Sequence, residues 1–171
     1  NASFYLFSKK KEDENHRLKG TVMEESCDFE KERWGAWKVD TGFVHSGKYA
    51  YLLTDEFSPG VSKKILDLPG AGYRIGSFSA FVYSKQKMQD AVLVICTERA
   101  GKTMEYRSFD LGLLSVKKEF QQAFITLEIP NDYEPGDLLK AYVYNPKRVP
   151  VILDDMKISV REEIDPYVLK Y

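Results

Sequence analysis

Cysteine, histidine and tryptophan are scarce in this chain, with two of each among 171 residues. Cys27 and Cys96 are too far apart in sequence to form a CxxC metal motif, and two thiolates alone rarely hold zinc. We expect both to be buried free thiols, because free cysteine is among the most buried residue types. A disulfide between them is the alternative if the chain is extracellular.

Long apolar runs and an excess of either charge are also missing. No stretch approaches the roughly 20 apolar residues of a membrane-spanning helix, so we expect no membrane span in this chain. Lysine and arginine number 25 against 26 acidic residues, which gives a formal net charge of -1. Proteins that bind nucleic acid generically need a basic stripe, so we expect no nucleic-acid partner.

Signatures of catalysis are absent or generic. His45 adjoins Ser46, but neighbouring residues make a poor nucleophile–base pair, and His16 lies in a polar stretch. The chain has no G-x-S-x-G motif, and the glycine-rich turn 69–72 lacks the lysine of a P-loop. We therefore predict no catalytic residues and no enzymatic activity. A glycoside or polysaccharide hydrolase, which needs two acids across a cleft, is the least favoured alternative.

The residues that are present predict an all-β protein. Short segments rich in β-branched and aromatic residues alternate with turns that contain Pro, Gly, Asn or Asp. Without crossover helices, about nine such strands indicate antiparallel sheets in a sandwich or barrel. The best helical candidate, Leu113–Phe120, is short. The expected strands are Thr21–Glu25, Lys48–Thr54, Val61–Leu68, Ile75–Ser84, Ala91–Glu98, Thr103–Asp110, Gln122–Ile129, Leu138–Tyr144 and Val151–Val160.

The domain organisation follows from these strands. We expect a polar N-terminal arm or linker over 1–20, the sandwich over 21–160 and a C-terminal extension over 161–171. The sequence begins with Asn1 rather than Met, so we expect it to be part of a longer precursor. A removed signal peptide or anchor is one interpretation, and an arbitrary boundary is the other.

Two strands carry informative side chains. In 77–83, alternation places Phe78, Ala80 and Val82 on one face and Ser77, Ser79, Phe81 and Tyr83 on the other. We expect one of these faces to enter the core and the other to meet solvent or ligand. Asp154 and Asp155 interrupt the apolar strand 151–160. Because consecutive strand residues point in opposite directions, one of the two carboxylates should point inward, where it needs a partner.

Three separated segments, 28–30, 45–49 and 151–158, place oxygen ligands or a sharp turn beside expected strands. They suggest that the first and last strands meet at one edge of the sandwich. Physical chemistry alone favours Asp154 or Asp155 accepting backbone amide hydrogen bonds at the strand end, with Lys48 as an ion-pair partner. Calcium, which takes oxygen ligands, is the alternative.

These segments also carry a resemblance. Over about 21–160 the chain resembles the galactose-binding-like, jelly-roll family of carbohydrate-binding modules of bacterial secreted and cell-surface proteins. The resemblance implies a structural calcium ion held by Glu30, the carbonyl of Lys48 and Asp154. It also implies an extracytoplasmic location, whether secreted, periplasmic or at the cell surface. The motifs that carry it are Phe29-Glu30, a following tryptophan, His45-Ser46-Gly47-Lys48-Tyr49, Ser79-Ala80-Phe81-Val82-Tyr83 and Ile152-Leu153-Asp154-Asp155-Met156-Lys157-Ile158.

Aromatic residues supply the candidate ligand site, because sugar rings stack their C–H faces on flat aromatic side chains. Two tryptophans flank a Gly-Ala pair in a charged stretch, and Tyr142 lies with other tyrosines in the expected strands. For each ring, packing in the core is the alternative. We predict ligand contacts for Trp34, Trp37, Tyr83, Tyr106 and Tyr144.

The combined expectation is a non-catalytic carbohydrate-binding module that recognises a glycan by aromatic stacking and hydrogen bonds. The alternative is a structural or protein-interaction β-sandwich without a sugar site, whose partner would be a cell-surface protein. A groove with exposed rings favours the first, and a broad apolar patch favours the second.

Overall fold

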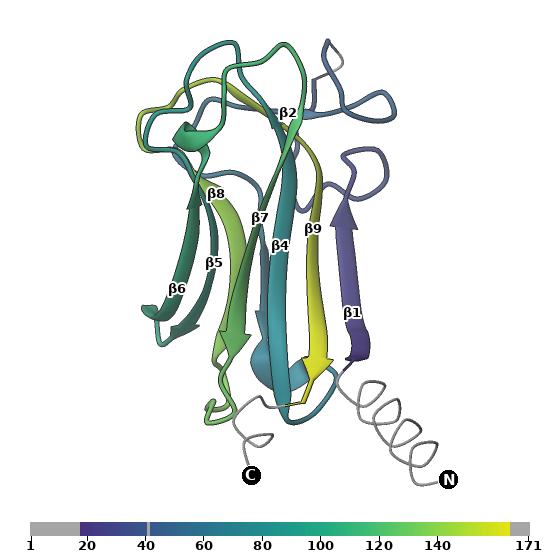
Figure 1. Cartoon of the computed structure of the whole chain (residues 1–171), viewed down its shortest axis with the longest axis vertical. Helices are drawn as coiled ribbons and strands as arrows, with labels where there is room; N and C mark the ends of the chain where they lie inside the picture. Colours follow the sequence, from purple (N-terminus) through teal and green to yellow (C-terminus); the bar gives the residue numbers. More distant parts are fainter. Residues whose placement is uncertain (1–17, 41, 165–171) are drawn as a thin grey trace, which may run out of the picture.

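The fold is a sandwich of two antiparallel sheets, as Figure 1 shows for the computed structural model, which describes residues 18–40 and 42–164. Nine strands and two short 3-10 helices make up the described part of the chain. The predicted all-β, jelly-roll architecture is confirmed.

The first sheet has five strands. Its main path runs β1 (Leu18–Cys27), β9 (Val151–Glu163), β4 (Tyr73–Tyr83) and β7 (Gln121–Ile129). The fifth strand, β2 (Tyr51–Leu53), pairs with the N-terminal part of β9, while β1 pairs with the remainder. The first and last strands therefore meet, as predicted.

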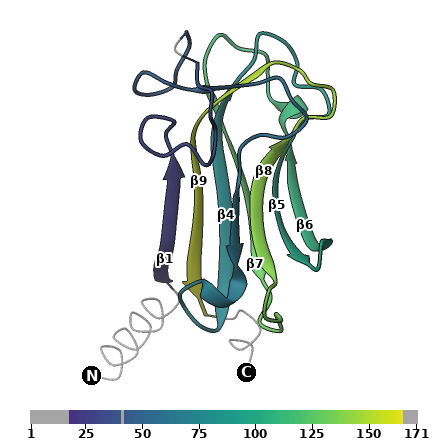
Figure 2. The same ribbon diagram turned by 180° about the vertical axis from the view of Figure 1, so that it is seen from behind.

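The second sheet has four strands in the order β3 (Val61–Lys64), β8 (Leu138–Tyr144), β5 (Val92–Arg99) and β6 (Lys102–Asp110). Figure 2 shows this sheet from behind, with β8, β5 and β6 curving away from the first sheet. Every pairing between strands in both sheets is antiparallel.

Alternation along the strands fills the space between the sheets. Phe78, Ala80 and Val82 of β4 are fully buried, so theirs is the face of this strand that enters the core. In β8 the buried residues are Leu139, Ala141 and Val143, so the residues between them face outward. The core is apolar, and the outer faces carry the candidate ligand chemistry.

Several element boundaries differ from the predictions. β8 has the predicted bounds. β2 is only three residues long, because the backbone N–H groups of Lys48 and Tyr49 donate to the Glu30 carboxylate instead of to a neighbouring strand. The end of the predicted strand Val61–Leu68 is the 3-10 helix η1 (Ile65–Asp67). The best helical candidate, Leu113–Phe120, forms no helix. A single 3-10 turn, η2 (Leu111–Leu113), precedes it and overlaps it only at Leu113, and the Asp110 carboxylate caps this turn by accepting from the Gly112 N–H.

β1 begins at Leu18, within the predicted arm, and β9 runs to Glu163, within the predicted extension. Apart from Ile164, which follows β9, the rest of both predicted terminal segments lies outside the described residues. No helix among the described residues is long and apolar enough to cross a membrane. Cys27 and Cys96 are both free and buried, as expected.

Candidate functional site

Segments from three parts of the chain meet at the upper end of the first sheet, and we call this region the closure: residues 28–30, 45–49 and 154–155. Asp154 of β9 is fully buried here. Its Oδ2 accepts hydrogen bonds from the backbone N–H groups of His45 (2.9 Å) and Ser46 (3.1 Å). Its Oδ1 accepts from the N–H of Asp155 at 2.8 Å. The backbone amide hydrogen bonds that the sequence favoured are therefore present, whereas the ion pair with Lys48 stays a prediction.

Burial raises the pKa of Asp154, and the three amide hydrogen bonds act in the opposite direction. A buried carboxylate needs such donors, because leaving it without them costs free energy. The 45–46 amides thus tie a loop to a strand more than 100 residues later in sequence.

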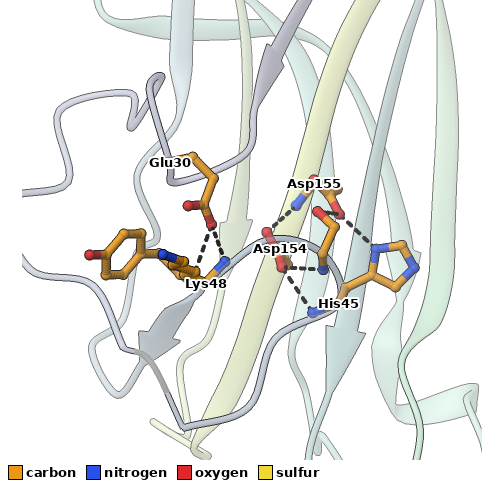
Figure 3. Close-up of polar contacts among 7 residues, drawn as sticks. Glu30, His45, Lys48, Asp154 and Asp155 are labelled. Carbon is orange, nitrogen blue, oxygen red and sulfur yellow. Dashed lines mark hydrogen bonds and ion pairs between the residues drawn. The ribbon is translucent and has the colours of Figure 1, made fainter.

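Glu30 holds the other side of the same loop. Its Oε1 accepts from the N–H groups of Lys48 (2.8 Å) and Tyr49 (2.6 Å). Figure 3 shows the loop lying between Glu30 on one side and the Asp154–Asp155 pair on the other. Gly47 sits at the tip with φ +62°, and a Cβ added there would collide with the Glu30 carboxylate. Glycine is therefore required both by the backbone angle and by the close approach.

Asp155 points outward next to the buried acid. Its Oδ2 accepts from Ser46 Oγ at 2.6 Å and lies 2.6 Å from His45 Nδ1. The backbone at Asp155 has φ +45°, at a register shift between β9 and β4. This bulge redirects the Asp155 carboxylate toward the 45–49 loop. The ring of His45 then stacks on Phe81 with centroids 3.6 Å apart.

The closure offers the oxygen donors that calcium prefers: the carboxylates of Glu30 and Asp154 and the carbonyl groups of the 45–48 loop. The chemistry of this donor set fits the ion, and a cation would offset the cost of burying Asp154. Both carboxylates already accept amide hydrogen bonds, however. Among the described residues, no group of three or more His, Cys, Asp or Glu side chains is placed to hold a metal.

A second region, the outer face of the four-stranded sheet, carries exposed rings. We call it the ring face. Residues that pair directly in antiparallel strands share a face. Val94 pairs with Tyr142, Cys96 pairs with both Lys140 and Tyr106, and Val92 pairs with Tyr144. The three tyrosines therefore lie on one face of β8 and β6.

Phe57 extends this set from the loop before β3. It forms an isolated bridge with Tyr144, and the two ring centroids are 5.1 Å apart. Tyr142 meets Phe57 edge-on at 5.8 Å and 65°. Phe57 is 53% exposed and Tyr106 is 48% exposed, whereas Tyr142 and Tyr144 are half-buried. The ring face thus offers aromatic surface that the fold itself does not cover.

Polar groups lie among these rings. Lys140 Nζ is 3.1 Å from Glu98 Oε2, and the register places both side chains on the ring face. Phe57, Tyr142, Glu98 and Lys140 line a hollow of about 370 Å³ together with Ser62. This volume lies within the range of about 300–1,000 Å³ found for small-molecule sites.

Tyr142 also contacts a buried thiol. Burial, together with the neighbouring Cys96 and Tyr106, raises the pKa of Tyr142 to about 12. Burial likewise raises the pKa of the Cys96 thiol, and that of Cys27 to about 12. At neutral pH the phenol is a hydrogen-bond donor and neither thiol is ionised, so neither is an activated nucleophile. The ring face is suited to stacking and hydrogen bonding.

The structure brings together only some of the residues predicted to contact ligand. Tyr106 and Tyr144 share the ring face. Trp34 is half-buried in the loop after β1, where its ring packs against Phe78 with centroids 6.3 Å apart. The other two predicted residues lie beside the five-stranded sheet: Trp37, which is 90% exposed, and Tyr83, on the outer face of β4. The assignment of ligand contacts to these five residues stays a prediction.

Two residues of the ring face were not in the predicted set. Tyr142 stands two positions before Tyr144 in the same predicted strand, so period-two alternation places them on one face. That signal was available in the sequence. Phe57 lies outside every predicted strand, and only the bridge to Tyr144 brings it to the sheet.

Comparisons with known proteins support the fold. No family model matches the chain, and no curated protein matches it. Among solved structures, the tandem CBM22 domains of Paenibacillus barcinonensis align with a TM-score of 0.50 at 16% identity, covering 88% of this chain and 47% of that chain. The chain therefore spans about half the length of the tandem.

Two other solved structures have lower TM-scores. A CBM22 xylan-binding domain from the same organism aligns with a TM-score of 0.43 at 18% identity, covering 84% of this chain and 96% of that chain. A Stig cyclase from Fischerella sp. TAU aligns with a TM-score of 0.44 at 12% identity, covering 83% and 86% respectively. The chain has the jelly-roll β-sandwich fold that it shares with the CBM22 tandem.

Proposed function

We propose that the protein is a non-catalytic carbohydrate-binding module whose ligand lies on the ring face. The observation that carries this proposal is a set of exposed or half-buried rings gathered on the outer face of one sheet beside a charged pair: Phe57, Tyr106, Tyr142 and Tyr144. The shared fold with the CBM22 tandem supports the same class of function.

Stacking and hydrogen bonding divide the work in this proposal. Sugar rings place their C–H faces on aromatic side chains, which remain half-open or exposed on β6 and β8. Glu98 accepts and Lys140 donates hydrogen bonds, so the pair provides both partners that a sugar hydroxyl needs. Because the two charges already neutralise each other, the face favours a neutral sugar over a charged one.

Retention in native gels that contain xylan, galactomannan, β-glucan or galactan tests the proposal. At least one polysaccharide should slow the protein, and Tyr142→Ala should weaken that interaction about tenfold or more, as loss of a central ring does. Phe124→Ala is the matched control, because Phe124 is an equally exposed ring, at 53%, on β7 of the other sheet. Equal mobility in all gels would instead favour the protein-interaction alternative.

An extracytoplasmic location is part of the proposal, because polysaccharides of this kind lie outside the cytoplasm. The shared fold with the CBM22 tandem supports it. Fractionation of cells that produce the natural full-length protein tests it: the protein should appear in the medium, the periplasm or the surface fraction. Recovery in the cytoplasm alone would contradict it.

Calcium is proposed as a stabilising ion of the closure, with no part in ligand binding. Glu30, Asp154 and the carbonyl of Lys48 would hold it, and its charge would stabilise the carboxylate that β9 buries. The amide hydrogen bonds to the same carboxylates act with it. The expected effect on thermal stability is given in the Discussion.

A further inference from the structure

We propose a second carbohydrate site, separate from the ring face, on the outer face of the five-stranded sheet. It rests on the proposed function, since it adds a second glycan contact to the same module. We call it the edge groove: the surface that runs from Trp37 across Leu52 and Ile152 to Tyr83.

Strand register builds the floor of the edge groove. Leu52 of β2 pairs with Ile152 of β9, and Ile152 pairs with Tyr83 of β4. Directly paired residues share a face, so these three side chains form one row across three adjacent strands. Their neighbours along the chain, Leu53 and Val82, are fully buried, so the row points away from the core.

Two hollows lie next to each other along this row. The first, of about 450 Å³, is lined by Trp37 and Thr54, and the second, of about 420 Å³, by Tyr83 and Gln86. Asp40 and Leu52 line both of them, so the two hollows are direct neighbours. Each volume alone lies in the range of small-molecule sites.

An aromatic ring stands at each end. Trp37 is 90% exposed, the most open of the large apolar side chains among the described residues, so the fold gains almost nothing from it. Tyr83 is held in place at the other end by Phe43, whose ring stacks on it at 4.2 Å. Phe120 stacks in turn on Phe43 at 5.5 Å. One ring is thus free to stack on a ligand, and the other is fixed by its neighbours.

The charges around the groove point to a neutral oligosaccharide. Lys38 and Asp55 line the first hollow, Lys85 lines the second, and Asp40 lines both, so two cations face two carboxylates. Asp55 also lies 3.7 Å from Arg148. A balanced set of donors and acceptors suits sugar hydroxyls and gives no preference for an anionic ligand.

Two sites on the outer faces of two packed sheets point in opposite directions. One module can therefore contact two glycan chains, or two parts of a folded one. Once the first site is occupied, binding at the second is intramolecular, which strengthens binding to a polysaccharide beyond the affinity of either site alone. The ring face alone gives a single contact per module.

Trp37 supplies the test, because the sequence has two tryptophans and the other, Trp34, is half-buried. The probes are xylohexaose, mannohexaose, cellohexaose and galactohexaose, with polygalacturonate as the anionic comparison. Iodide quenching of tryptophan fluorescence measures how far a bound probe shields Trp37 from solvent. We expect at least one neutral probe to reduce quenching, and to do so equally in Tyr142→Ala, which lacks the central ring of the other site. Trp37→Phe, which keeps a ring, should bind with the quenching change lost.

Calorimetry with the same probes separates the two sites. Trp37→Ala should weaken one of two binding steps about tenfold, and Tyr142→Ala should weaken the other. One binding step that Trp37→Ala leaves unchanged, with no cover of Trp37, overturns the edge groove and leaves the proposed function standing. Loss of all binding in Trp37→Ala, with Tyr142→Ala unchanged, overturns the ring face and leaves the groove. If no probe binds the unmodified protein or either variant, both sites are overturned. Preference for polygalacturonate over the neutral hexasaccharides overturns the assignment of a neutral ligand.

Discussion

The closure and the ring face use their side chains in opposite ways. In the closure, Asp154 and Glu30 direct their oxygens at backbone amides of the same loop, so the chain satisfies itself. On the ring face, Phe57 and Tyr106 keep about half of their surface open. Interactions completed within the fold stabilise it, whereas uncovered aromatic surface is available to a partner. We therefore propose that the first region serves stability and the second serves recognition.

The largest expected effect comes from the buried acid of the closure. Asp154→Ala removes the acceptor for three backbone N–H groups, two of them from the 45–49 loop. Buried donors left without a partner are costly, so we expect the free energy of unfolding to fall by about 3 kcal/mol. Urea denaturation followed by circular dichroism measures it.

Asp155→Ala is the matched control on the same strand. Asp155 is half-exposed, and its hydrogen bonds go to the side chains of His45 and Ser46. We expect a loss of about 1 kcal/mol. If the two variants lost the same free energy of unfolding, the distinction between the inward and outward carboxylates would fail.

The turn at Gly47 gives the next largest effect. Gly47→Ala forces a side chain into left-handed backbone and into the Glu30 carboxylate, so we expect a loss of about 2 kcal/mol. Gly101→Ala is the control, because Gly101 also has a positive φ (78°) but open space around a Cβ. It should lose only the backbone part, about 1 kcal/mol. Equal losses would show that the contact with Glu30 carries no energy.

Calcium sharpens the comparison further. At ten times its dissociation constant, an ion that binds only the folded protein stabilises it by about 1.4 kcal/mol. We expect the melting temperature to fall on chelation and recover with calcium, and Glu30→Gln to abolish the response. Scanning calorimetry with and without chelator measures it. An unchanged melting temperature would leave the amide hydrogen bonds as the whole account of the closure.

The smallest expected effect on stability comes from the Arg99–Asp137 pair, which lies outside both regions and serves as a reference for them. Arg99 forms hydrogen bonds of 3.0 and 2.8 Å with Asp137, and this lowers the pKa of Asp137 below its ordinary value of 3.8. A carboxyl group whose pKa is depressed by folding stabilises the fold above the ordinary value. That stability is lost as the pH falls through the lowered pKa.

Arg99→Gln should therefore flatten the loss of stability below about pH 4. Urea midpoints measured across this acid range for both proteins test the expectation. The same slope in the variant would mean that Asp137 does not contribute to acid unfolding.

The sequence predicted the closure better than the ring face for a physical reason. A buried acid and a tight turn require particular residue types. Asp154 therefore stands out in an apolar strand, and Gly47 stands out directly before the expected strand Lys48–Thr54. The nine strands follow from alternation, which the core demands. A helix at 113–120 failed because the segment is too short to bury an apolar face after the cap at Asp110.

Ligand residues are harder to predict because a ring in a strand looks the same whether it faces core or solvent. Tyr106 and Tyr144 fall on one face only through the pairing of β6 and β8 with β5, which is a long-range property. Trp34 has charged neighbours in sequence, yet its ring packs on Phe78. Phe57 reaches the ring face from a loop that alternation does not describe.

The central claim is that recognition lies on the ring face and stability in the closure. An amide NMR titration with the hexasaccharide of the best-retained polysaccharide tests it most directly. The account predicts large shift changes for the amides of β6 and β8, including Tyr106 and Tyr142, while those of His45 to Tyr49 stay in place. Shift changes at His45 to Tyr49 with β6 and β8 unaffected would contradict it.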